Sequence, residues 1–319
     1  APYDGVEILS SDPTLTEGLL WYNSTSNVLK VARNIAAWAS GGTYPSTHTE
    51  IAATGIISAV IAAGGTDNST IQQTSYEYDG TSWASNVAIN TARTSTSRGG
   101  TQTSALIAGG ASSYSGSGAR TNTVESYNGT AWSNETNHDH DYAWMGGCGA
   151  SETAAITVSG KTAAGHNYTN TSDEYNGSSW SAGGNSNYTG QSRFGTGVQT
   201  AAVFAGGKNA GGYDLTSEEY NGASHTAGNS MATARGYHGA AGTMTDALMY
   251  DGDSPTTEIY NGTSYSSGTA NDGRIGAGGH GASSTSAYAV AGQADGFGSV
   301  LNTTQEYSEG MTARTLTNS

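Results

Sequence analysis

The sequence has little of what most globular chains use to fold. One cysteine, Cys148, and four prolines occur in 319 residues, so no internal disulfide can hold the chain together. Leu, Ile, Val and Phe together make up about 11% of the residues, a fraction more typical of disordered chains. A lone cysteine in a β-rich chain is usually a small buried hydrophobe, and we expect this of Cys148.

Other absences limit the partners of the chain. Lys and Arg number 11 against 26 Asp and Glu, a net charge of −15, so we expect no nucleic-acid partner, because phosphate binding needs clustered basic residues. No apolar run reaches 18 residues, so we expect no membrane insertion. The sequence begins with Ala1 and lacks the charged-then-apolar layout of a signal peptide. We therefore expect a processed form of the protein.

Aromatic residues are present at regular intervals. A Thr/Glu-rich strand, a Tyr, a turn and usually a second aromatic return six times, 40 to 49 residues apart. This period predicts one four-stranded β-propeller blade per repeat, and hence an all-β fold of about six blades. The repeated tyrosines are Tyr78, Tyr127, Tyr175, Tyr220, Tyr260 and Tyr307, and the residues that close the motif are Trp83, Trp132, Trp180, His225 and Tyr265.

A second motif is a short apolar strand that ends in a Gly pair or its remnant, such as ALIAGG, which ends at Gly110. The distance from each closing aromatic to the next Gly pair is always 27 or 28 residues, whereas that from Gly pair to Tyr varies from 8 to 17. The constant segment predicts an outer strand followed by two inner strands. The variable segment predicts a surface loop between the second and third strands. Asn-Gly or Asp-Gly pairs after the tyrosines predict type I′ turns between the third and fourth strands.

Trp38 lies 27 residues before Gly65, the interval of a fourth strand, but no complete third strand precedes it. The last repeat, at Tyr307, lacks its closing aromatic. We therefore predict that the strand around Trp38 completes the final blade and closes the ring.

Residues 1–33 precede the repeats and alternate like a β-hairpin over 18–33. The sequence thus predicts an arm or hairpin at 1–33 and a propeller at 34–319. Apolar arm residues need a partner surface, in this chain or a neighbouring one, because a lone hairpin is barely stable in water. These candidate assembly residues are Leu19, Leu20, Trp21, Tyr22, Val28, Leu29 and Val31.

The Gly pairs at 64–65, 109–110 and 206–207, with the Tyr/Trp pairs, resemble the kelch repeat over residues 38–315. The phrases GTQTSALIAGG and TEGLLWYNSTSNVLKV are similar to repeat-rich virion proteins of bacteriophages, in which such hairpins adjoin structural domains. These resemblances imply a kelch-like propeller and a tail or fibre protein on a virion surface.

The richest cluster of metal-ligating side chains is NHDHD at 137–141. Zinc sites need three or four converging ligands, whereas alternation in an extended segment puts the two His and the two Asp on opposite sides. A solvated turn is the alternative. The candidate ligands are His138, Asp139, His140 and Asp141.

Acidic residues recur beside each repeated Tyr, such as Glu77 and Glu125. We interpret them as exposed strand residues or, alternatively, as a ring of carboxylates that binds divalent cations. Sequons for N-glycosylation overlap several of the Asn-Gly turns. The candidate glycosylation sites are Asn23, Asn68, Asn128, Asn134, Asn167, Asn170, Asn176, Asn187, Asn261 and Asn302.

The sequence contains no catalytic constellation and calls for no cofactor, so we expect no enzyme. We expect a self-assembling structural subunit of a virion or an extracellular filament, a homo-oligomer or helical polymer. The alternative is a glycan- or receptor-binding propeller at a fibre tip, in which exposed tyrosines stack on sugars. The candidate tyrosines are Tyr114, Tyr168, Tyr188 and Tyr213.

Overall fold

The computed structural model describes residues 6–113, 119–162, 167–294 and 298–316, and every regular element among them is a β-strand. The chain divides into two compact units. Unit 1 contains Ala1–Ala37 and Tyr307–Ser319, and unit 2 contains Trp38–Glu306. No helix of the described residues is long and apolar enough to cross a membrane.

The repeats fold into antiparallel sheets whose four main strands follow one another in chain order. The first sheet contains β4 (Ala52–Ile56), β5 (Ala59–Ala63), β6 (Ser75–Tyr78) and β7 (Trp83–Asn86). The second contains β8 (Ser97–Thr101), β9 (Ser104–Ala108), β10 (Val124–Tyr127) and β11 (Trp132–Asn134). The third contains β13 (Gly146–Ser151), β14 (Ala154–Thr162), β15 (Tyr168–Tyr175) and β16 (Trp180–Ala182), with β12 (Tyr142–Ala143) beside β14.

The fourth sheet contains β17 (Gly195–Val198), β18 (Ala201–Ala205), β21 (Ser217–Tyr220) and β22 (His225–Ala227). A separate two-stranded sheet, β19 (Lys208–Asn209) and β20 (Gly212–Tyr213), lies between β18 and β21 in the chain. The fifth contains β23 (His238–Thr243), β24 (Asp246–Asp251), β25 (Glu258–Tyr260) and β26 (Tyr265–Ser267).

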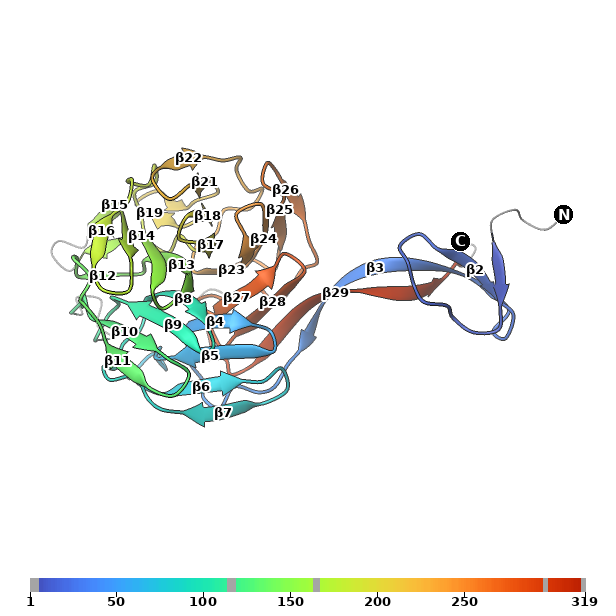
Figure 1. Ribbon diagram of the computed structural model, residues 1–319, viewed down its shortest axis with the longest axis horizontal. Coiled ribbons are helices and arrows are strands. Elements are labelled where there is room, and N and C mark those ends of the chain that lie inside the picture. Colours follow the sequence, from blue (N-terminus) through green and yellow to red (C-terminus); the bar gives the residue numbers. More distant parts are fainter. Residues whose placement is uncertain (1–5, 114–118, 163–166, 295–297, 317–319) are drawn as a thin grey trace. The chain divides into compact units, whose positions relative to one another are not determined.

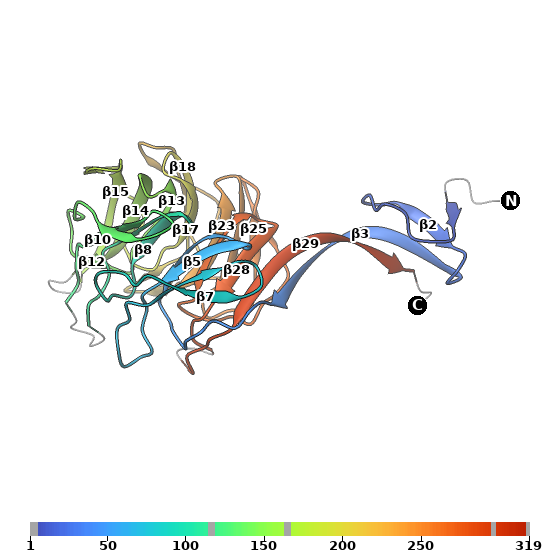
Figure 2. The ribbon, with the colours of Figure 1, turned by 60° about the horizontal axis from the view of Figure 1, so that its bottom comes forward.

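The sixth sheet joins the two ends of the chain. Its order is β27 (Gly278–Ser283), β28 (Ser286–Val290), β29 (Thr304–Thr315) and β3 (Val28–Ser40), followed by β2 (Leu20–Asn23) and the parallel β1 (Glu7–Leu9). The strand that carries Trp38 therefore takes the fourth place, as its 27-residue interval predicted. Figure 2 shows β3 and β29 side by side.

The hydrophobic cores of unit 2 lie between consecutive sheets. One core joins Ile61 and Ala63 of the first sheet to Ile107, Tyr127 and Trp132 of the second. Similar cores join the second sheet to the third, the third to the fourth, the fourth to the fifth and the sixth to the first. The small residues of the second strands let neighbouring sheets approach, and a buried tyrosine fills each gap, which contributes about 2–3 kcal/mol.

The first strands of the six sheets contact one another in a cycle. Each contacts the first strand of the next sheet, and β27 contacts β4; Figure 1 shows these strands at the centre of unit 2. Before each first strand, one residue has a left-handed backbone with φ between +54° and +64°. Five backbone N–H···O bonds of 2.6–3.1 Å link neighbouring members of this set. The left-handed residues are Glu50, Ser95, Trp144, Ser192, Tyr237 and Gly276.

The turns between third and fourth strands differ from the prediction. Tyr127 pairs with Trp132, so the Asn-Gly pair opens a four-residue loop and not a two-residue type I′ turn. The Asn128 carboxamide oxygen accepts the N–H groups of Thr130 and Ala131, both at 3.0 Å. This side-chain cap fixes the loop, and only Gly129 has a positive φ, +88°.

Candidate functional site

The first strands end around a cavity of about 480 Å³ in unit 2. A glycine from each of the six sheets lines it: Gly55, Gly100, Gly149, Gly197, Gly242 and Gly281. At Gly55 the φ is +117°, and a Cβ would lie 2.1 Å from the Ala59 carbonyl oxygen, so no other residue fits. The wall is therefore mostly backbone and small side chains.

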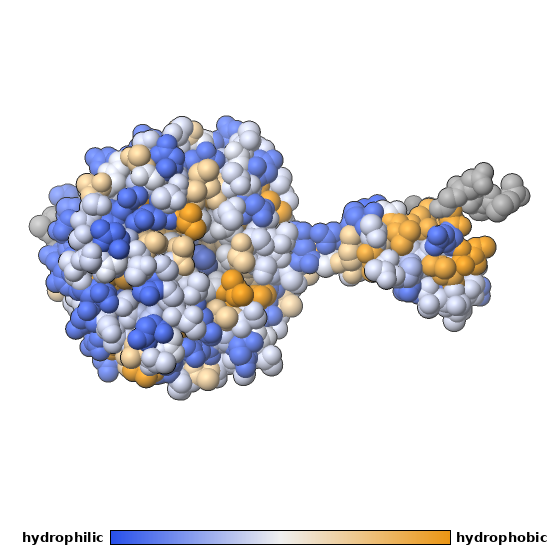
Figure 3. All heavy atoms as spheres, viewed as in Figure 1, coloured by the Kyte–Doolittle hydropathy of each residue, from blue (hydrophilic) through white to orange (hydrophobic). Residues whose placement is uncertain are grey.

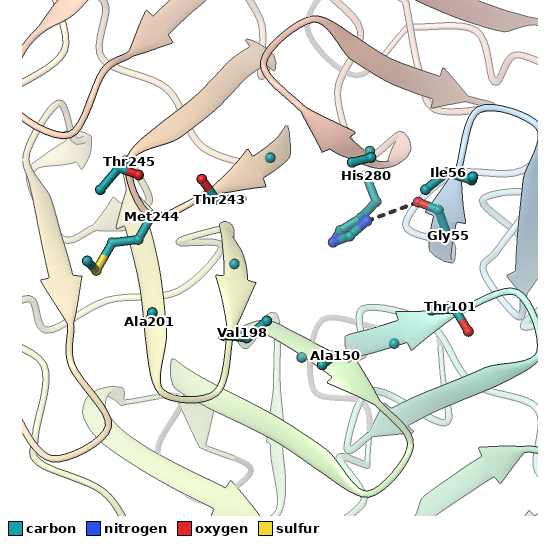
Figure 4. A pocket seen from close by; sticks show the side chains of 16 residues that line it. Gly55, Ile56, Thr101, Ala150, Val198, Ala201, Thr243, Met244, Thr245 and His280 are labelled. Carbon is teal, nitrogen blue, oxygen red and sulfur yellow. Dashed lines mark hydrogen bonds between the residues drawn. The ribbon is translucent and has the colours of Figure 1, made fainter.

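His280 supplies the principal polar side chain of this cavity. Its Nδ1 donates to the Gly55 carbonyl at 3.1 Å, and the ring extends from β27 toward the cavity, as Figure 4 shows. Nε2 is buried and has no hydrogen-bond partner among the described residues. Burial lowers the pKa of His280 to about 4, so at neutral pH Nε2 is an uncharged acceptor.

Arg98 joins sheets across the middle of unit 2. From β8 it donates to the Gly279 carbonyl of β27 at 3.1 Å, and its guanidinium carbon lies 4.6 Å from the centre of the Phe194 ring. No described carboxylate is within ion-pair distance of it. Burial lowers the pKa of Arg98, and the cation–π contact partly offsets this cost.

Arg98 also lines a cavity of about 20 Å³, room for one water molecule. It is also lined by Glu50, Trp144 and Tyr237 from the left-handed set. Ser95 Oγ and Trp144 Nε1 donate to the Glu50 carboxyl group. Burial raises the pKa of Glu50 despite these bonds.

Three buried arginines form ion pairs with carboxylates that lie two residues before a repeated tyrosine. The N–O distances are 2.8, 3.2 and 3.0 Å for Arg93–Glu125, Arg193–Glu218 and Arg235–Glu258. Glu125 also accepts the N–H groups of Asn90 and Thr91. Sequence reasoning missed these pairs; an acidic residue at Tyr−2 together with one arginine per repeat is the signal that could have found them.

The repeated tyrosines bridge neighbouring sheets. Tyr78, Tyr127, Tyr220 and Tyr260 each donate, at 2.5–2.9 Å, to the glutamate that directly precedes the tyrosine of the previous sheet. The acceptors are Glu306, Glu77, Glu174 and Glu219. Tyr175 and Tyr307 use Glu135 and Glu309 instead. The acidic residues beside the tyrosines are therefore bridges and buried ion-pair partners, not exposed strand residues.

The NHDHD segment does not form the proposed metal site. His138 is buried; its Nδ1 lies 3.1 Å from the backbone N of His140, and its Nε2 lies 3.0 Å from Thr157 Oγ1 and 3.4 Å from Asp173. Asp139 and Asp141 are exposed. Across the described ranges, no three His, Cys, Asp or Glu side chains are placed to hold one ion. The segment instead anchors a loop onto the third sheet.

The aromatic pairs of the repeats are in contact within their sheets, stacked in Tyr78–Trp83 and tilted in the other two. Ring centres lie 4.9, 5.1 and 5.0 Å apart for Tyr78–Trp83, Tyr127–Trp132 and Tyr175–Trp180. Trp38 Nε1 donates to the Thr269 carbonyl at 3.0 Å, as Trp180 Nε1 donates to the Thr136 carbonyl at 3.1 Å. Both acceptors lie four residues after the aromatic that begins the preceding fourth strand, so Trp38 has the equivalent position. Cys148 is buried in the core between the third and fourth sheets, and burial raises its pKa to about 12.

Unit 1 differs from the predicted arm in two respects. It includes Tyr307–Ser319, which the sequence boundaries assigned to the propeller. Trp21 is fully buried and donates to Asp12, which also accepts from Asn23 and from Lys30. The indole is therefore the core of unit 1 and not an assembly contact. The other six candidate assembly residues are half-buried: Leu19, Leu20, Tyr22, Val28, Leu29 and Val31.

Two sugar-related expectations are also corrected. Asn23 is buried with its amide on Asp12, so it cannot carry a glycan in this fold. Tyr188 is buried under Arg193, at 4.4 Å, and cannot stack on a ligand. Tyr168 and Tyr213 are half-buried, and Tyr114 lies outside the described residues. The other sequon asparagines are exposed or half-buried.

No family model and no curated protein sequence matches the chain. Among solved structures, the chain is similar to YjhT with a TM-score of 0.66 and 12% identity, over 82% of this chain and 96% of YjhT. At this identity the similarity concerns the fold alone.

Proposed function

We propose that the six sheets of unit 2 are the blades of a kelch-like, six-bladed β-propeller. The cyclic contacts of the first strands and the hydrogen-bonded set of left-handed residues support this arrangement. The third support is the cavity lined by all six first strands.

We propose that the protein is a non-enzymatic, self-assembling structural subunit of a virion or an extracellular filament. The observation that carries this proposal is the apolar surface of unit 1, which Figure 3 shows as a group of orange side chains. Ile8 is 72% exposed, Leu316 45% and Met311 38%. Exposed apolar side chains gathered on one small unit are typical of protein–protein contacts.

The charged groups of unit 2 support a structural role. Arg93, Arg193 and Arg235 neutralise buried carboxylates, and His138 binds Thr157 and its own loop. These side chains hold sheets or loops together, and Arg193 and Glu218 also line a cavity of about 370 Å³.

The test compares the oligomeric state of arm variants with a matched control. Ile8→Asp/Leu316→Asp places two charges on the apolar surface of unit 1. Val87→Asp/Leu215→Asp makes the same change at two exposed apolar positions of unit 2. We expect ordered assemblies by electron microscopy and sedimentation for the intact chain and the control, and their loss in the unit 1 variant and after removal of residues 1–30. Assembly that survives the unit 1 changes would contradict the proposal.

A second candidate function, glycan or receptor binding, is favoured by the cavity with His280. An uncharged ligand could fill this cavity and pack on its apolar wall beside the His280 ring. Retention on immobilised neutral glycans that is lost in His280→Asn would favour this function. Equal retention of the two proteins would reject it.

A further inference from the structure

Strand β29 has an edge that is only partly covered. It contains 12 residues, and its two neighbours in the sheet are β3 and the five-residue β28. Five residues cannot cover twelve. Among the described residues, the 309–315 portion of this edge, which belongs to unit 1, has no strand partner.

Hydrogen bonds at both ends of β29 show which backbone groups face this edge. Thr304 accepts from Gly41 and Leu316 donates to Leu29, so even-numbered residues face β3. Thr303 accepts from Ala291, so odd-numbered residues face the other edge. Because backbone groups alternate along a strand, the residues whose N–H and C=O point to the open edge are Glu309, Met311, Ala313 and Thr315.

We propose that this edge pairs with the same edge of a second copy, antiparallel and about a two-fold axis at Thr312. An axis normal to the sheet places odd-numbered residues opposite odd-numbered ones. Glu309 then faces Thr315 of the second copy, and Met311 faces its Ala313. Every outward N–H and C=O of the segment obtains a partner, which is what an unpaired strand edge lacks.

The side chains of this segment are complementary to themselves in that register. Apolar Met311 lies opposite apolar Ala313, and Thr312 lies opposite Thr312, a favourable cross-strand pair. Arg314 lies opposite Gly310. Neither Arg314 nor Glu309 faces its own kind, so no like charges oppose each other across the axis. A shift of two residues in either direction would leave one end of the 309–315 portion outside the pairing.

This pairing deepens the proposed function, on which it rests for the biological role of association. A two-fold contact is closed after two copies, whereas a polymer needs a second, different contact. The part of the apolar surface of unit 1 outside the paired segment, which includes Ile8 and Leu316, would supply the second contact. Dimer formation and polymer growth can therefore be measured separately.

The experiment is cysteine crosslinking of the full chain. In the proposed register Thr312 pairs with Thr312 at a non-hydrogen-bonded position, where Cα atoms lie about 4.5 Å apart, within disulfide range. We expect Thr312→Cys to give a disulfide-linked dimer under mild oxidation at least ten times faster than Arg314→Cys, which would face Gly310. Cys148 gives no background, because it is buried and its pKa is raised.

A second measurement does not depend on oxidation. Met311→Lys/Ala313→Lys places lysines opposite one another but keeps the backbone donors, and we expect the dimer Kd from sedimentation to rise at least tenfold. Val87→Lys/Leu215→Lys has the same charge change in unit 2 and should leave the Kd unchanged.

Equal crosslinking of the two cysteine variants, or an unchanged Kd in the lysine variant, would overturn the pairing even if the chain polymerises. Crosslinked dimers without larger assemblies would uphold the pairing and reject the proposed polymer.

Discussion

The two units of this chain differ in how they bury and pair their large side chains. Unit 2 repeats the same solution from sheet to sheet: a buried tyrosine, a glutamate that accepts its hydroxyl, and an arginine–carboxylate pair. Unit 1 has two large, fully buried side chains, Trp21 and Tyr307, and exposes Ile8, Met311 and Leu316. The exposed apolar side chains of unit 2, such as Val87 and Leu215, belong to a much larger unit with many buried residues, whereas those of unit 1 belong to a small one.

The largest effect expected in unit 2 comes from breaking one buried ion pair. Arg93→Met leaves the Glu125 carboxylate buried without a counter-charge, which should cost about 3–5 kcal/mol in urea unfolding. In the double variant Arg93→Met/Glu125→Gln no charge is left buried, and the amide oxygen can keep one of the two bonds from Asn90 and Thr91, which Glu125 accepts on different oxygens. It should therefore lose less than the single variant, and an equal loss would show that the charge is unimportant.

The matching change in unit 1 is Trp21→Ala. The lost burial should cost about 3–5 kcal/mol, but in unit 1 alone. Hydrogen exchange should then show faster exchange in β2 and in Val28–Val31 of β3, with β9 unchanged. Tyr22→Ala, at a half-buried neighbour, is the control for general loosening of the hairpin. Faster exchange throughout unit 2 would mean that the units are not independent.

The pH dependence of stability should distinguish the cavity from the rest of unit 2. The pKa of His280 is about 4 in the fold, against an ordinary histidine value of 6.5 in the unfolded chain, so the unfolded chain takes up a proton first on acidification. Stability present above pH 6.5 is therefore lost as the pH falls from 6.5 to 4, by about 2 kcal/mol for a partly exposed ring. His280→Asn, which keeps a donor for Gly55, should reduce this slope in urea titrations. Burial also lowers the pKa of His48, His225 and His238, so an unchanged slope would assign it to those groups.

Replacement of Trp38 tests how much β3 stabilises the sixth sheet, in which strands from the two ends of the chain pair. It is half-buried, whereas Trp180, with the equivalent hydrogen bond, is 9% exposed. We expect Trp38→Ala to cost about 2 kcal/mol and Trp180→Ala about 3–5 kcal/mol in thermal or urea unfolding. No measurable cost for Trp38→Ala would mean that β3 does not stabilise the sixth sheet.

The smallest expected effect comes from removing one tyrosine–glutamate hydrogen bond between sheets. Tyr220→Phe removes the 2.8 Å bond to Glu174 but keeps the ring, and should cost about 1 kcal/mol. Tyr175→Phe removes a bond of 3.3 Å and should cost less. The reverse order in urea unfolding would show that these distances do not rank the bridges.

The intervals of 27 or 28 residues between aromatics and Gly pairs predicted the strand order, including the place of β3. A constant interval indicates that the chain follows the same path in each repeat. They did not predict the partners of side chains that meet through space. Tyr127 is 50 residues from Glu77, and Arg93 is 32 residues from Glu125. The membership of Tyr307–Ser319 in unit 1 was also missed, because the tail resembles a segment of the repeats.

The Asn-Gly turns and His138 were misread for a different reason. Asn128 caps its own loop and His138 accepts from its own backbone neighbour. Such local bonds depend on side-chain conformations that residue types alone do not specify.

The place of β3 in the sixth sheet has a consequence for synthesis. Its neighbour β29 is made only after the whole of unit 2, so at 5–20 residues per second β3 waits roughly ten to fifty seconds on the ribosome without its partner. During that time the edge of β3 that will pair with β29 has no partner strand. Any nearby nascent copy of the chain has the same unpaired edge. Pairing of β3 with β29 of its own chain therefore competes with pairing to β29 of a neighbouring chain. The distance between ribosomes on the mRNA affects the balance between the two.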